Sequence, residues 1–228
     1  MNDRAKQYFY DGIAADFDRI MNPYEVGRRL EIVFDELLGP RELTGKSVLD
    51  VGTGTGRFAE RAAQAGARVI ATDIGINLLR RTRARVAAPV FAADACQLPL
   101  QAESFDVVVS SECIEHTRDP LRALREMCRV VRRPGVLVVT TPNRAWHFSV
   151  AIARRLRLRP YDGFENWVGR ADVKSTLAAE GLTLSAIRGF HLVPPLFKPL
   201  RAPLRRIDRY GTALGPVMLN VAVRAEKR

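Results

Sequence analysis

The sequence contains few cysteines and no long apolar segment. Its 228 residues include only Cys96, Cys113 and Cys128, and no two of them have the CxxC spacing of a zinc or redox site. This odd number argues against a disulfide framework, so we expect reduced thiols. Nowhere do about 18 apolar residues follow one another without a charge, and the start of the chain lacks the apolar core of a signal peptide. These absences predict a cytoplasmic protein.

Lysine is also scarce, although the chain is strongly basic. Only five of the 36 basic residues are lysine, and the 25 acidic residues leave a net charge of +11. The segments 144–159 and 192–209 carry +5 and +4 of this charge. Both mix arginine with bulky apolar residues, as a surface in contact with an anionic membrane does. A merely basic lid, a pocket for an acidic or phosphorylated acceptor, and codon bias are the alternatives.

Strand and helix patterns alternate along the chain. Runs rich in Val, Ile and Ala predict strands at 47–51, 68–73, 89–93, 105–110 and 136–141. Helical patterns lie between most of them, at 56–65, 75–86 and 119–132. A later helix is expected at 171–180, later strands at 182–190 and 216–224, and helical stretches before the sheet at 3–20 and 24–38. This alternation predicts one α/β domain whose parallel sheet has helices on both faces.

A glycine-rich turn follows the first predicted strand. Asp50, Gly52, Gly54 and Gly56 form the pattern D-x-G-x-G-x-G, which leaves backbone N–H groups at a helix N-terminus open to a ligand. In the dinucleotide fingerprint the third glycine would stand at position 57, which is occupied by Arg57. The pattern therefore weakens the case for a pyrophosphate ligand.

Acidic residues follow the next two predicted strands. Asp73 lies 21 residues after Gly52, where a carboxylate accepts hydrogen bonds from ribose hydroxyls. Asp94 follows the third strand and suits an adenine amino group. A glycine turn followed by two acids fits S-adenosylmethionine, an adenosyl cofactor without phosphate.

Together these segments resemble the class I S-adenosylmethionine-dependent methyltransferases. The matching stretches are VLDVGTGTG, VIATDI, AADACQLPL, FDVVVSSECIEHTRDP and VRRPGVLVVTTPN. The resemblance implies a Rossmann-like, doubly wound sheet of seven strands in the order 3-2-1-4-5-7-6, with the last strand antiparallel. It also implies a set of cofactor-binding residues: Asp50, Gly52, Thr53, Gly54, Gly56, Asp73, Ile74, Asp94, Ala95 and Ser110.

Some of these residues have structural alternatives. Asp50 could hold the glycine turn through backbone N–H groups, Asp94 could cap a short turn, and Ile74 could belong to the core.

The resemblance further divides the single domain into cap helices at 1–40, a cofactor-binding core at 45–143, and lid or acceptor-pocket insertions at 144–170 and 191–215.

Two acids and a histidine follow the fourth predicted strand. Glu112, Glu115 and His116 stand at i, i+3 and i+4, and they share one face if a helical turn begins here. His116, with Glu112, could act catalytically by removing a proton from a hydroxyl. Alternatively all three could bind Mg²⁺, which would stabilise a phenolate. A third interpretation is that Glu115 and His116 only cap the turn and contact the ribose or the surrounding structure.

This turn, with Asp119-Pro120 and the later TTPNR stretch, resembles the ubiquinone-biosynthesis O-methyltransferases. In those enzymes the two acids and the histidine are linked to a metal and to catalysis. The resemblance implies O-methylation of a small lipophilic acceptor, quinone-like or lipid-like. The alternatives are a methyltransferase for a polar metabolite or for RNA or protein, and a non-catalytic module.

Nucleic acid is not an expected partner. No Asn/Asp-Pro-Pro-aromatic base-methylation motif follows the fourth predicted strand, and aromatic residues do not interleave a basic stripe. The sequence leaves the oligomeric state open.

Overall fold

The computed structural model describes residues 3–39, 42–148, 163–192 and 201–228. Several arginines of the basic segments and one lysine lie outside these residues, namely Arg154, Arg155, Arg157, Arg159 and Lys198. None of the described helices is long and apolar enough to cross a membrane.

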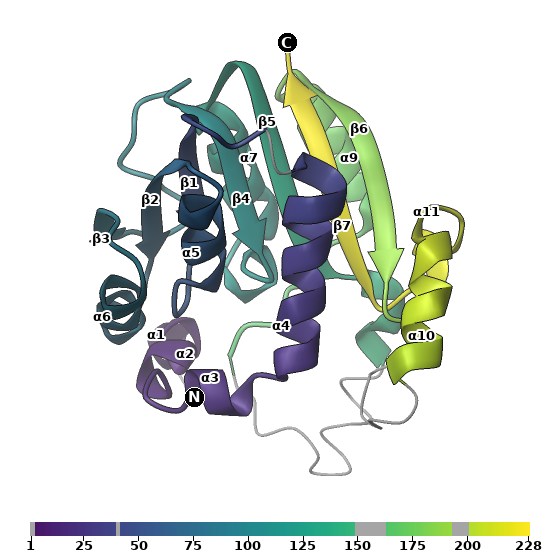
Figure 1. The fold of residues 1–228 in the computed structure, drawn as a ribbon, viewed down its shortest axis with the longest axis horizontal. Coiled ribbons are helices and arrows are strands. Elements are labelled where there is room, and N and C mark those ends of the chain that lie inside the picture. Colours follow the sequence, from purple (N-terminus) through teal and green to yellow (C-terminus); the bar gives the residue numbers. More distant parts are fainter. Residues whose placement is uncertain (1–2, 40–41, 149–162, 193–200) are drawn as a thin grey trace.

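A seven-stranded sheet forms the centre of the molecule (Figure 1). Its strands are β1 (Ser47–Val51), β2 (Arg68–Asp73), β3 (Val90–Ala92), β4 (Phe105–Ser111), β5 (Val131–Pro142), β6 (Leu182–Phe190) and β7 (Asn220–Lys227). They lie in the order β3-β2-β1-β4-β5-β7-β6. Neighbours from β3 to β5 are parallel, and β7 is antiparallel to both β5 and β6. The predicted sheet order and antiparallel last strand are therefore confirmed.

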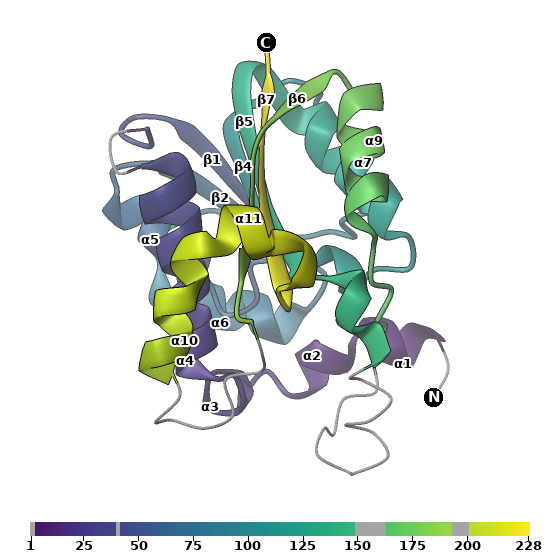
Figure 2. The same cartoon turned by 90° about the vertical axis from the view of Figure 1, so that its right-hand side faces the viewer.

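Helices bury both faces of this sheet (Figure 2). On β4, Val108 belongs to one hydrophobic cluster while Val107 and Val109 belong to the other. The first cluster includes residues of α7 (Pro120–Val130) and α9 (Arg170–Ala179), and the second includes residues of α5 (Arg57–Gln64) and η1 (Glu31–Leu38). Because side chains alternate along a strand, a strand buried on both faces has an almost unbroken apolar sequence.

The N-terminal segment is more broken than its helical pattern predicts. Instead of one helix over 3–20 there are α1 (Asp3–Gln7), α2 (Phe9–Gly12) and α3 (Phe17–Ile20), which lie along the lower edge of the sheet in Figure 1. The second stretch forms α4 (Pro23–Leu30), which runs directly into the π-helical η1. Asn22 caps α4, since its Oδ1 accepts the Tyr24 N–H at 3.1 Å.

The predicted strand at 216–224 began too early. Before β7 the chain forms α10 (Arg201–Ile207), η5 (Asp208–Tyr210), α11 (Gly211–Leu214) and η6 (Gly215–Val217). A Cβ atom on Gly211 would lie 2.1 Å from the Gly189 carbonyl oxygen, so this helical segment packs directly on β6. Close backbone packing, which strand alternation cannot reveal, determines where β7 begins.

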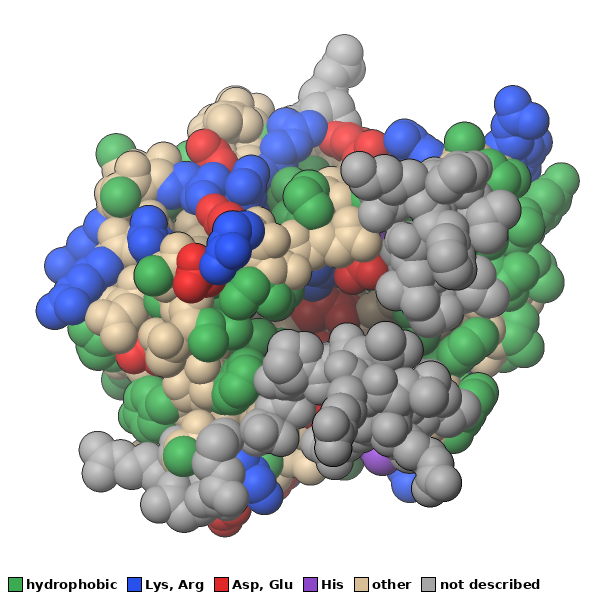
Figure 3. Space-filling model, turned by 90° about the horizontal axis from the view of Figure 1, so that it is seen from below, with side chains coloured by type: hydrophobic (Ala, Val, Ile, Leu, Met, Phe, Trp, Pro, Cys, Tyr) green, Lys and Arg blue, Asp and Glu red, His purple; other side chains and the backbone are tan. Residues whose placement is uncertain are grey.

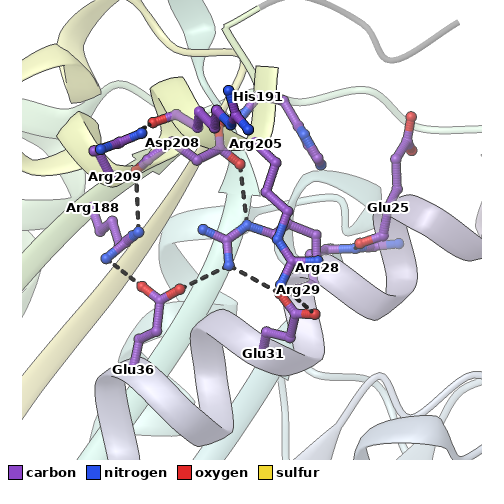
Figure 4. Close-up of polar contacts among 11 residues, drawn as sticks. Glu25, Arg28, Arg29, Glu31, Glu36, Arg188, His191, Arg205, Asp208 and Arg209 are labelled. Atoms are coloured by element: carbon purple, nitrogen blue, oxygen red, sulfur yellow. Dashed lines mark hydrogen bonds and ion pairs between the residues drawn. The ribbon is translucent and has the colours of Figure 1, made fainter. Parts of the chain in front are cut away.

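A buried ionic network joins α4 to this C-terminal segment (Figure 4). The Arg28 side chain donates to Asp208 at 3.1 Å and to Glu36 at 2.7 Å. Arg28 is 6% exposed and Asp208 is 0% exposed. Asp208 also accepts the His191 N–H at 2.9 Å. The network therefore ties together segments that lie 180 residues apart in sequence.

Replacing Asp208 with alanine is expected to lower the free energy of unfolding by about 3 kcal/mol, because Arg28 would keep a buried charge that has lost a partner. Urea denaturation measures this loss. Asp35→Ala serves as the control, because it breaks an exposed pair with Arg61 that is worth less than about 1 kcal/mol. Equal effects for the two variants would contradict the stabilising role of the network.

Candidate active site

The carboxyl ends of β1, β2 and β4 meet at one edge of the sheet, next to the N-terminal helices (Figure 1). Seen from below in Figure 3, this edge has a hollow with acidic side chains on its floor and hydrophobic side chains beside it. In open α/β sheets ligands bind at this edge.

The glycine turn connects β1 to α5 in a conformation that needs glycine. Gly52 and Gly54 have φ angles of +72° and +57°, a region that other residues rarely adopt. A Cβ atom on Gly52 would also lie 2.3 Å from the Cys113 sulfur. The turn is thus shaped by backbone conformation and by close packing against the loop after β4.

Asp73, at the end of β2, faces this turn. Its Oδ2 accepts the Gly54 N–H at 2.9 Å and its Oδ1 accepts the Gly75 N–H at 2.9 Å. Burial raises the pKa of the Asp73 carboxyl, and these backbone donors oppose the rise. The structure therefore brings Asp73 and Gly54, two predicted cofactor residues, into direct contact.

Asp50 and Thr53 use their polar side-chain atoms within the turn. The Thr53 hydroxyl donates to Asp50 Oδ2 at 2.6 Å, and both residues are buried. Burial raises the pKa of the Asp50 carboxyl to about 7, although the Thr53 hydroxyl opposes the rise. These contacts match the interpretation in which Asp50 holds the turn, and a cofactor contact of Asp50 stays a prediction.

The pKa of Asp50 predicts a pH dependence of stability. Its ordinary value is 3.8, so between about pH 4 and pH 7 the folded state holds a proton that the unfolded state has lost. This contribution to the free energy of unfolding is complete below about pH 4 and is lost as the pH rises to about 7. Asp50→Asn keeps an acceptor for Thr53 but does not titrate.

Urea denaturation at about pH 5 and about pH 8 tests this expectation. The wild type should lose more stability than Asp50→Asn between the two values. Since the other carboxyls titrate in both proteins, the difference isolates Asp50. Parallel losses in the two proteins would contradict the raised pKa.

The remaining predicted cofactor residues fall into two groups. Ile74 follows β2 and Asp94 follows β3, and both are half-buried. Asp94 Oδ1 accepts the Cys96 N–H at 2.8 Å. Ala95, the next residue, is buried. The Asp94 contact is a local turn cap, which was the alternative weighed for this residue. Ser110 is fully buried and its hydroxyl donates to the Val51 carbonyl at 2.9 Å. Ser110 therefore links β4 to β1, and its contact with a cofactor is untested.

These residues fit an adenosyl cofactor. Asp73 and Asp94 follow neighbouring strands, and their carboxylate oxygens can accept hydrogen bonds. Ribose hydroxyls and an adenine amino group can donate such bonds. At Gly54 a Cβ atom would lie 3.7 Å from the Phe17 ring, so Phe17 of α3 packs against this part of the turn.

The loop after β4 does not form the helical face predicted for the two acids and the histidine. Glu112 has a φ of +51°, and the 3-10 helix η2 begins only at Ile114 (Ile114–His116). Glu112 therefore lies outside the helix. The shared helical face, expected if a helical turn began at Glu112, does not form. A left-handed, non-glycine residue at this edge is strained, and such strain is typical of functional sites.

His116 is held in one tautomer. Its Nδ1 lies 2.8 Å from the Phe164 carbonyl oxygen, which can only accept, so Nδ1 carries the proton in the neutral ring. Nε2 is then an acceptor, and it lies 3.3 Å from the Tyr10 hydroxyl. The Tyr10 ring packs edge-on against the imidazole with centroids 4.9 Å apart. His116 thus presents a basic nitrogen toward the N-terminal helices.

Glu115 is buried and Glu112 is half-buried, and both carboxyls have raised pKa values. Burial is the main cause for both, and for Glu115 the charge of Glu112 adds to it. Glu112 accepts hydrogen bonds from Thr140 at 3.1 Å and from Asn220 at 3.0 Å. Glu115 is 1% exposed, and its Oε1 has no hydrogen-bond partner among the described residues.

The arrangement does not fit the predicted magnesium site of Glu112, Glu115 and His116. Within the described ranges no three His, Cys, Asp or Glu side chains come close enough together to hold a metal ion. Both His116 nitrogens have other contacts, with the Phe164 carbonyl and the Tyr10 hydroxyl. We therefore derive no step through a metal.

Several contacts at this edge had no signal in the sequence. Asp18 of α3 accepts the Thr55 hydroxyl at 2.7 Å, and Asp11 accepts the Asn77 N–H at 2.6 Å at the start of α6 (Ile76–Arg85). Gln7 donates to Asp94 at 3.1 Å. No motif or spacing marks these residues, because they meet the core only through tertiary structure.

Comparisons with known proteins agree with this geometry. A family model described as a methyltransferase domain matches residues 49–139. A probable S-adenosylmethionine-dependent methyltransferase of Mycobacterium tuberculosis is 40% identical over 118 residues, which cover 51% of this chain and only 42% of that protein. A ubiquinone biosynthesis O-methyltransferase of Rhizobium etli is 30% identical, over 68% of this chain and 67% of that protein.

The fold has matches among solved structures as well. Magnesium protoporphyrin IX methyltransferase from Synechocystis, solved with bound S-adenosylhomocysteine, superposes with a TM-score of 0.70 over 99% of both chains at 16% identity. At this identity the match concerns the fold alone. From its sequence relatives and its sheet order together, the chain belongs to the S-adenosylmethionine-dependent methyltransferases.

Proposed function

We propose that the protein transfers the methyl group of S-adenosylmethionine to a hydroxyl of a small lipophilic acceptor. The observation that carries this proposal is the fixed tautomer of His116 at the edge that also holds the glycine turn and Asp73. With Nδ1 held by the Phe164 carbonyl, Nε2 is the nitrogen that faces a hydroxyl at this edge, as its 3.3 Å contact with Tyr10 shows, and such a nitrogen is suited to take a proton from an acceptor hydroxyl.

In this proposal the cofactor lies along the carboxyl ends of β1 to β3. The glycine turn contacts the methionine end, Asp73 accepts from the ribose hydroxyls, Ile74 covers one adenine face, and Asp94 with Ala95 binds the adenine edge. When bound, the cofactor supplies an electrophilic methyl group on sulfur. The cap at 1–40, the core at 45–143 and the insertions at 144–170 and 191–215 keep their predicted roles.

His116 accepts the acceptor's proton on Nε2 as the oxygen attacks the methyl carbon. Glu115 Oε1 lies 3.9 Å from Nε2, so the protonated ring has a nearby oxygen that can stabilise its charge. Burial, and after it the charge of Glu112, raises the pKa of Glu115, and Glu112 contacts β5 and β7 through Thr140 and Asn220. Alignment of the reacting atoms in a dry hollow supplies much of the remaining acceleration.

The lipophilic nature of the acceptor rests on two observations. Hydrophobic side chains lie beside the acidic hollow in Figure 3, and the Rhizobium relative is named for ubiquinone biosynthesis. Arg144, Arg205, Arg206 and Arg209 are exposed in the two basic segments. Contact of these segments with an anionic membrane stays a prediction.

Incubation with methyl-labelled S-adenosylmethionine and whole-cell extract tests the proposal. After the reaction, label is counted in the organic, aqueous and macromolecular fractions. Label in the organic phase supports a lipophilic acceptor. Label in water-soluble metabolites, RNA or protein would contradict it and would favour the polar or macromolecular alternative.

A further inference from the structure

Three of five consecutive residues in the N-terminal segment contact the chain that follows three strands at the active-site edge. We call residues 7–11 the plug segment. Gln7 donates to Asp94 after β3, the Tyr10 hydroxyl meets His116 after β4, and Asp11 accepts the Asn77 and Leu78 N–H groups after β2. The segment is therefore attached at both proposed ligand sites and at the N-terminus of α6.

The two outer contacts imitate the contacts proposed for the ligands. Because the Asp94 carboxylate only accepts, the Gln7 side-chain N–H takes the place proposed for the adenine amino group. The Tyr10 hydroxyl, 3.3 Å from His116 Nε2, takes the place proposed for the acceptor hydroxyl. One short segment thus occupies a polar atom in each of the two proposed sites.

We propose that the plug segment is an internal competitor of both ligands, and that cofactor binding displaces it from His116 as well as from Asp94. This inference rests on the proposed function, since it uses the roles assigned there to Asp94 and His116. Gln7 and Tyr10 lie three residues apart, so adenine binding that displaces Gln7 also weakens the Tyr10 contact. The cofactor then binds first and prepares the base for the acceptor.

In competition of this kind, the cofactor binds only the molecules in which the plug segment is open. Its apparent association constant is therefore the intrinsic constant multiplied by the fraction of open molecules. Loss of one hydrogen bond from the closed state is worth about a two- to tenfold change in that fraction. Gln7→Ala is therefore expected to bind S-adenosylhomocysteine about two- to tenfold more tightly than the wild type. Tyr10→Phe keeps the aromatic packing and should tighten binding in the same direction.

Calorimetric titration with S-adenosylhomocysteine measures these affinities. Asp3→Ala, an exposed position on the same helix, is the control for Gln7→Ala, and Tyr210→Phe, at an exposed tyrosine outside the plug segment, is the control for Tyr10→Phe. Both controls should bind like the wild type. Gln7→Glu places a second carboxylate against Asp94, which opens the plug segment by repulsion, and it should tighten binding as Gln7→Ala does.

A second readout needs no ligand. Diethyl pyrocarbonate modifies unprotonated imidazole, and mass spectrometry follows His116 separately from the exposed His147, which serves as an internal reference. Gln7→Ala should speed modification of His116 relative to His147, because opening at Asp94 also frees Nε2. Tyr10→Phe should speed it at least as much.

The results separate the two proposals. A wild type that does not bind S-adenosylhomocysteine would overturn the proposed function, whatever the reactivity of His116. If the wild type binds and Gln7→Ala binds equally or more weakly, Gln7 is not a competitor and the inference fails. Unchanged His116 reactivity in Gln7→Ala would likewise overturn the coupling between the two sites.

Discussion

Replacing His116 with asparagine should lower kcat by about a hundredfold to ten thousandfold, the range typical of a lost general base. The affinity for S-adenosylhomocysteine should not fall, because His116 is proposed to contact the acceptor rather than the cofactor, and loss of the Tyr10 contact should raise it about two- to tenfold, as in Tyr10→Phe. Steady-state rates of labelled methyl transfer measure kcat, and calorimetry measures the affinity.

Gln64→Asn is the control, because Gln64 is exposed at the C-terminal end of α5, at the opposite edge of the sheet from the proposed site. Its kcat should equal that of the wild type. A His116→Asn enzyme with nearly wild-type kcat would show that proximity alone drives the reaction. A parallel loss of cofactor binding would place His116 in the cofactor site instead.

Asp73→Asn should weaken S-adenosylhomocysteine binding by about ten- to a hundredfold. The carboxylate is proposed to accept from ribose hydroxyls, and hydrogen bonds to charged groups contribute about 1.5–3 kcal/mol. The same carboxylate receives the Gly54 and Gly75 N–H groups, so the amide also loosens the glycine turn. Both effects act in the same direction on cofactor affinity.

Calorimetry and thermal unfolding together test this expectation. Asp35→Asn, an exposed acid that pairs with Arg61, is the control and should bind like the wild type. If Asp73→Asn remains folded and binds with wild-type affinity, the carboxylate does not hold the ribose. The cofactor would then have to lie elsewhere along the edge.

The sheet was predictable because its signals are local. Strands such as β2 and β6 are continuous apolar or alternating runs bounded by glycine or charged residues, and their predicted and observed limits coincide. The glycine turn and Asp73 were predictable for the same reason, since chemistry at a parallel sheet follows the strand ends in sequence.

The loop after β4 could not be predicted in the same way. Periodicity placed Glu112, Glu115 and His116 on one helical face, but Glu112 adopts a left-handed conformation. Its side chain bonds to Thr140 and Asn220, which come from strands far away in sequence. Tertiary contacts of this kind override a local helical pattern.

The contacts of the N-terminal segment were equally hidden. Gln7 and Asp11 look like ordinary helix residues in the sequence, and only the folded chain brings them to Asp94 and α6. The ionic network of Arg28 and Asp208 spans 180 residues and leaves no periodic trace. Such long-range polar pairs need the structure to be seen.

The chemical environment of the transferred methyl group shows directly whether the acceptor atom is a hydroxyl oxygen. Carbon-13 S-adenosylmethionine is incubated with the protein and cell extract, and the organic-phase product is examined by NMR. The wild type should give a methyl signal characteristic of an ether oxygen, and His116→Asn should lose it. A methyl group bonded to nitrogen or carbon, or a product confined to macromolecules, would contradict it.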